Sequence, residues 1–200
     1  ECNYSEARKE QVMTEGVLEN NMVKLRAPEP DDVDLLYVWE NNMEIWKVSN
    51  TITPFSRHLL KKYIETAHLD IWESKQLRLI IEAKDQNALM NVPVGLIDLF
   101  DFDPYHLRAG IGILIANQQY RRRGYATEAL KLLVRYCSGI LQLNQIYCNI
   151  SADNQVSLQL FKKQGFVEVG VKKSWLKTQS GWEDEVMLQL LNPKPRLPKN

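Results

Sequence analysis

Apolar and polar residues alternate along several short stretches of this chain, and segments with helical spacing lie between them. Alternating or continuous apolar runs predict strands over residues 22–27, 76–83, 92–102, 107–116, 145–151, 166–172 and 182–190. Pro30 followed by two acids predicts the start of a helix that runs to about residue 42, and a second helix is expected over residues 56–72.

Two further helices are predicted in the second half. Apolar residues recur at helical spacing over 126–137, where Gly139 is the expected terminator. Asp153 is a candidate N-cap for a helix through Lys163, which Gly165 would end. The element order β, α, α, β, β, β, α, β, α, β, β predicts an α+β fold, in which one helix crosses over between two neighbouring strands.

The composition narrows the class of protein. Lys plus Arg equals Asp plus Glu at 25 each, so no net charge directs the chain to nucleic acid or to an anionic membrane. No apolar run approaches the roughly 20 residues that span a bilayer. No secretory signal is visible. Three cysteines without a CxxC pair support neither a disulfide framework nor a zinc site, Cys137 and Cys148 lie in apolar stretches and are predicted to be buried, and we expect a cytoplasmic protein. The three histidines show no ligand spacing, so we expect no metal.

One domain is expected over residues 22–191. The polar residues 1–21 are interpreted as an N-terminal extension that is flexible or partly vector-derived, and residues 192–200 as a C-terminal tail.

Residues 118–130 read QQYRRRGYATEAL, between a predicted strand and a predicted helix. Free N–H groups at a helix start bind phosphate, and Gly124 lets the backbone approach a ligand. A solvated basic run before a helix explains the same letters. Residues 151–166 read SADNQVSLQLFKKQGF, which taken alone is an amphipathic helix closed by a glycine.

Together these stretches resemble the GNAT superfamily of acyl-CoA N-acyltransferases, in the branch of spermidine/diamine and ribosomal-protein N-terminal acetyltransferases. The family's loop signature, Gln/Arg-x-x-Gly-x-Gly/Ala, is matched at residues 121–126, and its Asn-helix signature at Asn154, Ser157, Leu160, Phe161, Lys163, Gly165 and Phe166. The beginning, VKLRAPEPDDVDLLYVWENN, is also similar, and the resemblance covers residues 22–191.

The resemblance implies a mostly antiparallel sheet splayed between two adjacent strands, with acetyl-CoA as co-substrate and a bulge on the strand before the loop. The pantetheine arm would pair with that strand, the loop would hold the pyrophosphate, Asn154 would hydrogen-bond the co-substrate and Phe161 would flank the thioester. The expected acetyl-CoA contacts are Leu114, Ile115, Ala116, Arg121, Arg122, Arg123, Gly124, Tyr125, Ala126, Thr127, Asn154, Phe161 and Lys162.

The chain departs from the family at both usual proton carriers. Phe161 stands where polyamine acetyltransferases have a catalytic Tyr, and Gly110 where many relatives have a Glu. Four readings remain: Asp98 as a base through water, Tyr147 or Ser151 near the start of the splay as a donor to sulfur, positioning alone, or a module that binds acyl-CoA and catalyses poorly. We favour Asp98.

The resemblance implies that the acceptor side lies at the end of the first helix, in the loop that follows it, and on the closing strand. Acidic and aromatic side chains there suit a cationic amine, although solvated loop charges are the simpler reading of each. The candidate acceptor residues are Glu40, Asn41, Asn42, Glu44, Trp46, Glu183, Asp184 and Glu185. The sequence thus predicts an N-acetyltransferase that moves acetyl to a small amine, polyamine or protein N-terminus in a ternary complex, with a homodimer as the assembly common in this branch.

Overall fold

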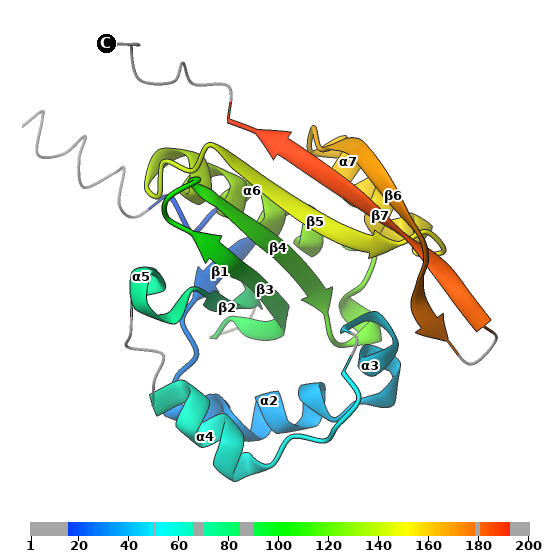
Figure 1. Cartoon of the computed structure of the whole chain (residues 1–200). Coiled ribbons are helices and arrows are strands. Elements are labelled where there is room, and N and C mark those ends of the chain that lie inside the picture. Colours follow the sequence, from blue (N-terminus) through cyan, green and yellow to red (C-terminus); the bar gives the residue numbers. More distant parts are fainter. Residues whose placement is uncertain (1–15, 50, 66–69, 85–89, 179–180, 193–200) are drawn as a thin grey trace, which may run out of the picture.

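A twisted sheet of seven strands forms the centre of the computed structural model, which describes residues 16–49, 51–65, 70–84, 90–178 and 181–192. The strands follow the order β1-β2-β3-β4-β5-β7-β6. Only β4 and β5 run parallel, and the other neighbours are antiparallel. The strands are β1 Val23–Arg26, β2 Leu77–Ala83, β3 Val92–Asp103, β4 Arg108–Ile115, β5 Gln145–Ser151, β6 Val167–Thr178 and β7 Gly181–Leu191. This arrangement confirms the α+β prediction (Figure 1).

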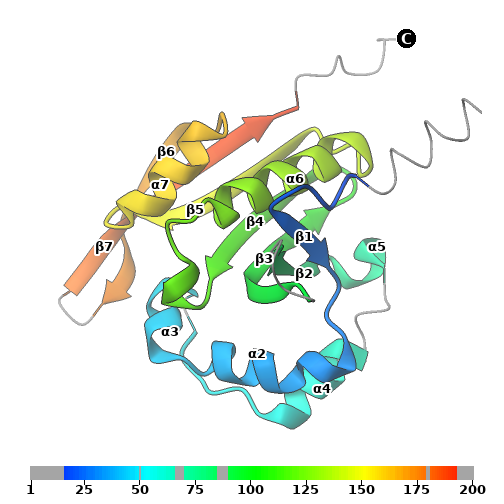
Figure 2. The same ribbon diagram turned by 180° about the vertical axis from the view of Figure 1, so that it is seen from behind.

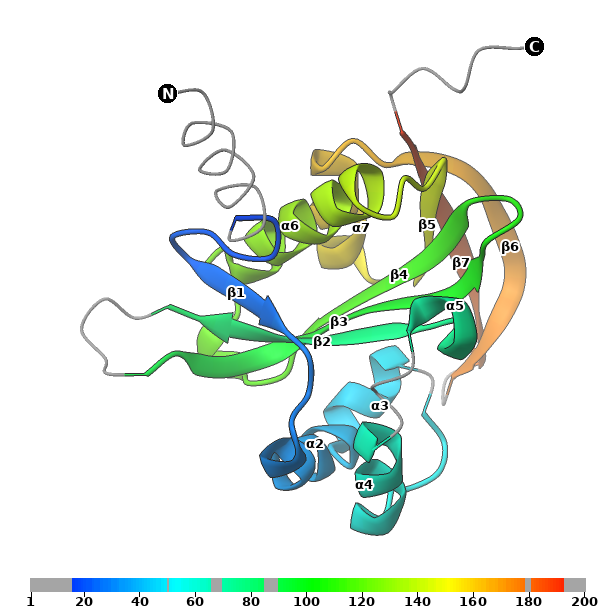
Figure 3. The same cartoon turned by 90° about the vertical axis from the view of Figure 1, so that its left-hand side faces the viewer.

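Helices cover the sheet from both sides, as the side view shows (Figure 3). They are η1 Pro30–Asp32, α2 Val33–Glu40, α3 Met43–Ser49, α4 Arg57–Glu65, α5 Ile71–Ser74, η2 Gln118–Tyr120, α6 Tyr125–Gly139 and α7 Gln155–Lys163. α6 and α7 lie on one side, which we call the α6 face (Figure 2). α2, α3 and α4 lie on the other side, which we call the α2 face.

The two faces have separate cores. The larger cluster joins α6 and α7 to the sheet through residues such as Leu130, Leu133, Ile111 and Leu188, each at most 2% exposed. A smaller cluster joins α2, α3 and α4 to β2 and β3. Cys137 and Cys148 are both buried, as predicted. Their burial raises the pKa of each thiol to about 12.

Three local predictions are wrong. The segment predicted as one helix over 56–72 contains two described helices, and α5 has its own N-cap because Asp70 accepts from the Trp72 and Glu73 amides at 2.8 and 3.0 Å. The N-cap of α7 is Asn154 rather than Asp153: its side chain accepts from the Ser157 amide at 3.1 Å.

The third concerns the loop expected after the first helix: residues 43–49 form α3 instead, and Asn42 accepts from the Glu44 amide at its start at 2.9 Å. Gly139 is the last residue of α6, as predicted, and Ile140 after it lies in the right-handed region. Gly165 ends α7 with φ 90°, as predicted.

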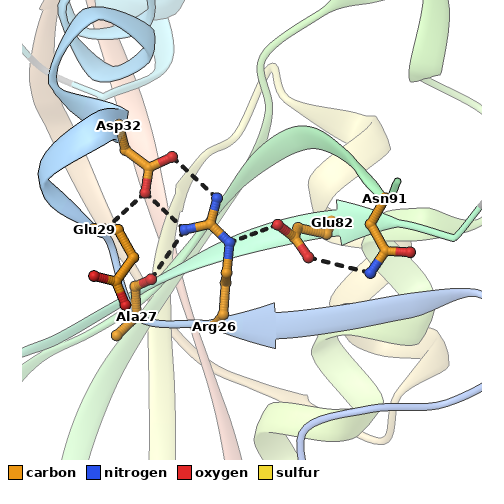
Figure 4. Close-up of polar contacts among 6 residues, drawn as sticks. All are labelled: Arg26, Ala27, Glu29, Asp32, Glu82 and Asn91. Carbon is orange, nitrogen blue, oxygen red and sulfur yellow. Dashed lines mark hydrogen bonds and ion pairs between the residues drawn. The ribbon is translucent and has the colours of Figure 1, made fainter. Parts of the chain in front are cut away.

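An arginine between two acids joins the α2 layer to the edge of the sheet (Figure 4). Arg26 of β1 donates to both oxygens of Asp32 at 2.6 and 3.0 Å and to Glu82 of β2 at 2.5 Å. Asp32 also accepts from the Glu29 amide at 2.7 Å, within a capping box that starts η1. This network fixes where the chain leaves the sheet and enters the helical layer.

The described part of the N-terminal segment contacts the domain. Leu18 packs against the larger core and its carbonyl accepts from the Leu25 amide at 2.7 Å. Asn20 donates to Glu128 of α6 at 3.0 Å. The domain limits drawn at residues 22 and 191 stay a prediction. Among the described residues, no helix is long and apolar enough to cross a bilayer, and no three metal-ligating side chains gather.

Candidate functional site

β4 and β5 separate after a short parallel start. They pair only where residues 108–110 meet residues 145–147, ending with Gly110 opposite Tyr147. Beyond that point β4 follows β3 to Ile115, while β5 follows β7 to Ser151. We call the gap between residues 111–115 and 148–151 the split. Its closed end lies at Gly110 and Tyr147, and its mouth lies at the other end, where β4 leads into the loop before α6. The expected splay is thereby present (Figure 1).

The backbone of β4 offers alternate residues to the split. The Ala116 amide donates to the Val94 carbonyl of β3 at 3.0 Å. In a strand, the backbone N–H and C=O of every second residue point to the same side. Leu114 and Gly112 therefore also turn their backbone N–H and C=O toward β3. Residues 111, 113 and 115 turn theirs toward the split. Of the predicted edge, Ile115 therefore has suitable backbone groups, whereas Leu114 and Ala116 do not.

The expected bulge lies on the neighbouring strand. The β3–β4 register shifts between Phe100 and Asp103, which face Gly110 and Arg108, so β3 holds the extra residue. Asp101 lies in this bulge with φ 50°, a left-handed conformation that Asp tolerates better than most residues. The bulge was predicted on β4, and the structure has it on β3 instead.

The loop at the mouth of the split suits an anion. Arg122 and Gly124 have φ 61° and 87°, and no side chain caps α6 at Gly124. Left-handed residues in a turn, followed by the free amides of a helix start, form a concave group of N–H donors. Tyr125, Ala126 and Thr127 form the first turn of α6 and are partly buried. These features fit a pyrophosphate.

The three loop arginines are exposed and differ in their contacts. Arg121 donates to the Ile115 carbonyl at 3.1 Å, and so fastens the loop to the split edge of β4. The guanidinium of Arg123 lies 5.7 Å from the centre of the Tyr120 ring. The backbone thus supplies the concave site, and the arginines surround it.

α7 brings only part of its predicted contacts to the mouth. Asn154 starts the helix at the mouth, but its side-chain oxygen is used by the cap, so its amide group is what remains for a ligand. Phe161 is 2% exposed and packs edge-on against Phe166 at 5.0 Å, within the core. Lys162 lies in the last turn, about 10 Å along the helix from its start, and pairs with Glu168 at 3.0 Å. The structure does not bring Lys162 to the loop.

Asp98 lies on the α2 face next to the split and is held by an arginine. It pairs with Gly112 of β4, and Arg78 of β2 donates to its two oxygens at 2.8 and 3.3 Å. Arg78 also donates to Glu40 of α2 at 2.5 Å. Arg78 thus engages both oxygens of Asp98, and the role of Asp98 as a base stays a prediction.

Charges and burial act against each other in this cluster. Burial lowers the pKa of Arg78, but the charge and hydrogen bond of Asp98 and the charge of Glu40 more than offset it, so the pKa is raised. Tyr63 of α4 faces Arg78, with 5.5 Å between the guanidinium and its ring, and burial raises the pKa of its phenol. The cluster thus holds two carboxylates and one guanidinium.

Phe100 fills the space beside Gly110, the position at which the resemblance leads us to expect a glutamate. A Cβ at Gly110 would lie 2.2 Å from the Phe100 ring, which no side chain can adopt without displacing it. Phe100 also packs edge-on against Tyr147 at 6.3 Å. The absence of a glutamate and the presence of Phe100 are therefore one structural feature.

Tyr147 and Ser151 occupy opposite ends of the split. Tyr147 is at the closed end, and its hydroxyl donates to Asp101 at 3.3 Å. Burial, and then the charge and hydrogen bond of Asp101, raise its pKa. Ser151 ends β5 at the mouth and donates to Glu183 at 2.7 Å. Ser151 was predicted near the start of the splay, which is wrong.

Several predicted acceptor residues have structural roles. Asn41 joins α2 to residue 55, because it donates to the Phe55 carbonyl and accepts from the Phe55 amide, each at 2.9 Å. Trp46 donates to the Glu40 carbonyl at 2.5 Å. Asp184 binds Lys173 and the Ser174 amide, and these bonds lower its pKa.

Two further acceptor candidates lie on α3 and on β7, where Glu185 pairs with Ser151 at the mouth of the split. Glu44 is exposed in the first turn of α3. Glu185 is 6% exposed and pairs with Lys172 at 2.6 Å. Of the whole acceptor set, only Glu40 joins the cluster beside the split.

Arg78, Phe100 and Asp101 were missed. Arg78 lies two residues before Ile80 in a mostly apolar strand, and so on the same side of the sheet as Ile80; a charge on the inner side of such a strand signals a buried pair. Phe100 and Asp101 gave no such signal, because their roles depend on a bulge and on a glycine in the next strand.

Comparisons with known proteins agree with this geometry. A family model described as the acetyltransferase (GNAT) domain matches residues 23–167. Spermidine N(1)-acetyltransferase of Escherichia coli K12 is 25% identical over 147 residues, 72% of each chain. Alpha/beta-tubulin-N-acetyltransferase 9 of Mus musculus is 30% identical over 105 residues, 50% of this chain and 44% of that protein.

Solved structures share the fold. Spermidine N-acetyltransferase from Vibrio cholerae, solved in complex with CoA and spermine, superposes with a TM-score of 0.76 at 23% identity and covers 88% of this chain and 98% of its own. The same enzyme in a dodecameric structure gives 0.70 at 23% identity, over 88% and 96% of the two chains.

Proposed function

The chain belongs to the acetyltransferase (GNAT) family, and we propose that the amine it acetylates is a small molecule with more than one positive charge. It is an acetyl-CoA-dependent N-acetyltransferase, as its relatives are. A module that binds acyl-CoA without catalysis is not favoured, because the relatives are acetyltransferases.

The cluster of Glu40, Arg78 and Asp98 carries this proposal. Two carboxylates share one guanidinium, so a negative charge remains beside the split. Arg78 occupies both oxygens of Asp98 and one oxygen of Glu40, and the second oxygen of Glu40 has no partner among the described residues. An ammonium group of the acceptor would bind there while a second amine reaches the split.

The split and its loop suit acetyl-CoA. We assign the pyrophosphate to the N–H groups of residues 122–127, with Arg121, Arg122 and Arg123 around it, and the amide group of Asn154 to the co-substrate at the mouth. The pantetheine arm would pair with the backbone of residues 111, 113 and 115. An N–H of this edge would also stabilise the negative charge that develops on the acetyl oxygen.

A panel of amines tests the acceptor. Acetyl-CoA is supplied with a monoamine, a diamine, spermidine, spermine and peptides with a free N-terminus, and release of CoA thiol is measured. We expect the diamine and polyamines to give the highest kcat/KM. Relatives named for spermidine and for tubulin make both classes reasonable acceptors. Turnover of peptides in preference to polyamines would overturn the proposal.

Location and assembly are proposed on separate grounds. Buried, unpaired Cys137 and Cys148 are typical of proteins from a reducing compartment, and we propose the cytoplasm. The homodimer expected from the sequence stays a prediction. Light scattering of the purified protein would distinguish it from a larger assembly such as the dodecamer of the Vibrio cholerae enzyme.

A further inference from the structure

A tyrosine and an aspartate meet at the closed end of the split, where the family's usual proton carriers are replaced. We propose that Tyr147 is a catalytic residue that takes the proton of the attacking amine and passes its own proton to Asp101. The proposal rests on the acetyl transfer stated above, although it does not depend on which amine is the acceptor.

Chain topology places the reacting end of the co-substrate near Tyr147. The loop that suits the pyrophosphate lies at the mouth, after β4 ends at Ile115. An extended arm that starts there and follows the edge of β4 runs toward the closed end, where Gly110 faces Tyr147. Five residues of strand span roughly 16 Å. The thioester end therefore comes to lie near Tyr147.

Gly110 allows the contact between Tyr147 and Asp101 to form. β4 lies between β3 and β5, so side chains of β3 reach β5 most easily across a position of β4 that has no side chain. Gly110 is that position: the Phe100 ring covers it and touches Tyr147 edge-on. The bulge at Asp101, with φ 50°, turns the Asp101 carboxylate toward the Tyr147 hydroxyl, which donates to it at 3.3 Å. Left-handed backbone at a non-glycine residue is often associated with function.

The proposed reaction transfers one proton from the amine to Tyr147 and one from Tyr147 to Asp101. The amine nitrogen bonds to the acetyl carbon, the carbon–sulfur bond breaks, and CoA leaves as a thiolate. The N–H proton passes to the Tyr147 oxygen while the Tyr147 proton passes to the Asp101 carboxylate. Asp101 is exposed and can release the proton to water. Tyr147 stays neutral overall, and its raised pKa keeps it protonated between turnovers.

Charged groups around Tyr147 are few among the described residues. Asp101 faces it from β3. Arg108 approaches from β4 and lowers the pKa of the phenol slightly against the larger effects of burial and Asp101. Arg108 is itself paired with Asp103 at 3.1 Å. Gln189 lies opposite Tyr147 on β7 and is neutral. Asp101 is therefore the carboxylate that can receive the proton.

The test uses the full chain with two acceptors: the best amine of the panel, and hydrazine, which is largely neutral at pH 8.5 and needs no second charge. Tyr147→Phe removes the hydroxyl and keeps the ring against Phe100. We expect kcat to fall about 10²-fold with both acceptors, a typical effect of general acid–base catalysis, while the KM for acetyl-CoA stays unchanged. Tyr105→Phe, in the exposed hairpin, should leave kcat unchanged.

Asp101 acts through Tyr147, so its role is tested by coupling. Asp101→Asn should lower kcat, Asp101→Glu should restore part of it, and Asp101→Asn with Tyr147→Phe should lose no more than Tyr147→Phe alone. Unchanged kcat in Tyr147→Phe, or losses that add in the double variant, would overturn the relay. Activity with hydrazine but with no polyamine would refute the proposed acceptor while leaving the relay testable.

Discussion

Two arginines on the α2 face lie between paired carboxylates, and only one of them borders the split. Arg26 and Arg78 each bind one aspartate through both of its oxygens and one glutamate through one oxygen. Around Arg26 every carboxylate oxygen has a donor, because the second oxygen of Glu82 accepts from Asn91 at 3.2 Å (Figure 4). That network is complete and serves the fold.

Around Arg78 one carboxylate oxygen has no donor in the part of the chain that the structure describes. Asp98 is fully used, but only one oxygen of Glu40 has a partner among the described residues. Tyr63 faces the guanidinium, and Gly112 leaves the adjacent position of β4 without a side chain. The same chemical group is thus structural at the edge of the sheet and, in our proposal, binds a further cation beside the split. The structural cluster around Arg26 and the proposed binding cluster around Arg78 differ in whether every carboxylate oxygen already accepts a hydrogen bond.

The largest expected effect is on stability at the Arg26 site. Arg26→Met leaves Asp32 and Glu82, whose side chains are 9% and 12% exposed, without their cation. Removing one partner of a buried pair costs 3–5 kcal/mol, and we expect about 3 kcal/mol because Arg26 itself is partly exposed. Urea unfolding measures it. A variant that keeps the wild-type midpoint would show that the network does not hold the helical layer.

The next effect separates the two glutamates. Glu40→Gln removes the charge that would bind the second ammonium, and we expect the KM for a diamine to rise about 10-fold, equivalent to about 1.4 kcal/mol. The KM for a monoamine should change little. Glu82→Gln is the matched control at the saturated site, where we expect lower stability and an unchanged KM. Equal effects of both variants on KM would remove the distinction between the clusters.

A smaller effect appears in the acid stability of the Arg26 site. Burial tends to raise the pKa of Asp32, but hydrogen bonds from Arg26 and the Glu29 amide, with the charge of Arg26, bring it below its ordinary value. A lowered pKa stabilises the fold above the unfolded-state value, near 4, and the contribution is lost as the pH falls through the folded-state value. Asp32→Asn should therefore flatten the loss of stability below about pH 4, measured by urea midpoints. Asp34→Asn, in an exposed pair, should keep the wild-type dependence.

The sequence predicted the elements of this site better than their contacts. The strand, loop and helix of residues 107–139 were predictable, because periodicity and the Arg-Arg-Arg-Gly-Tyr-Ala motif are local signals. The split itself followed only from the resemblance. It depends on where β4 stops pairing with β5, and that depends on contacts between residues far apart in the sequence.

Roles that depend on neighbouring strands could not be predicted. Asp98 was favoured as a base, but Arg78 from the next strand holds both of its oxygens. Gly110 indicated a missing glutamate, but not that Phe100 fills the same space. In each case a residue's chemistry is decided by its partner across the sheet, and register cannot be deduced from one strand at a time.

The smallest expected effect tests whether burial, rather than ion pairing as such, distinguishes these clusters. Arg57 binds Asp34 at 2.6 Å and lies 3.9 Å from the Tyr37 ring, yet the two charged side chains are 57% and 79% exposed. Exposed pairs contribute little because water already solvates both charges and salt screens them. Arg57→Met should leave the urea midpoint and the amine KM within experimental error. A midpoint shift as large as that of Arg26→Met would mean that geometry alone, and not burial of the partner carboxylates, determines the strength of these arginine contacts.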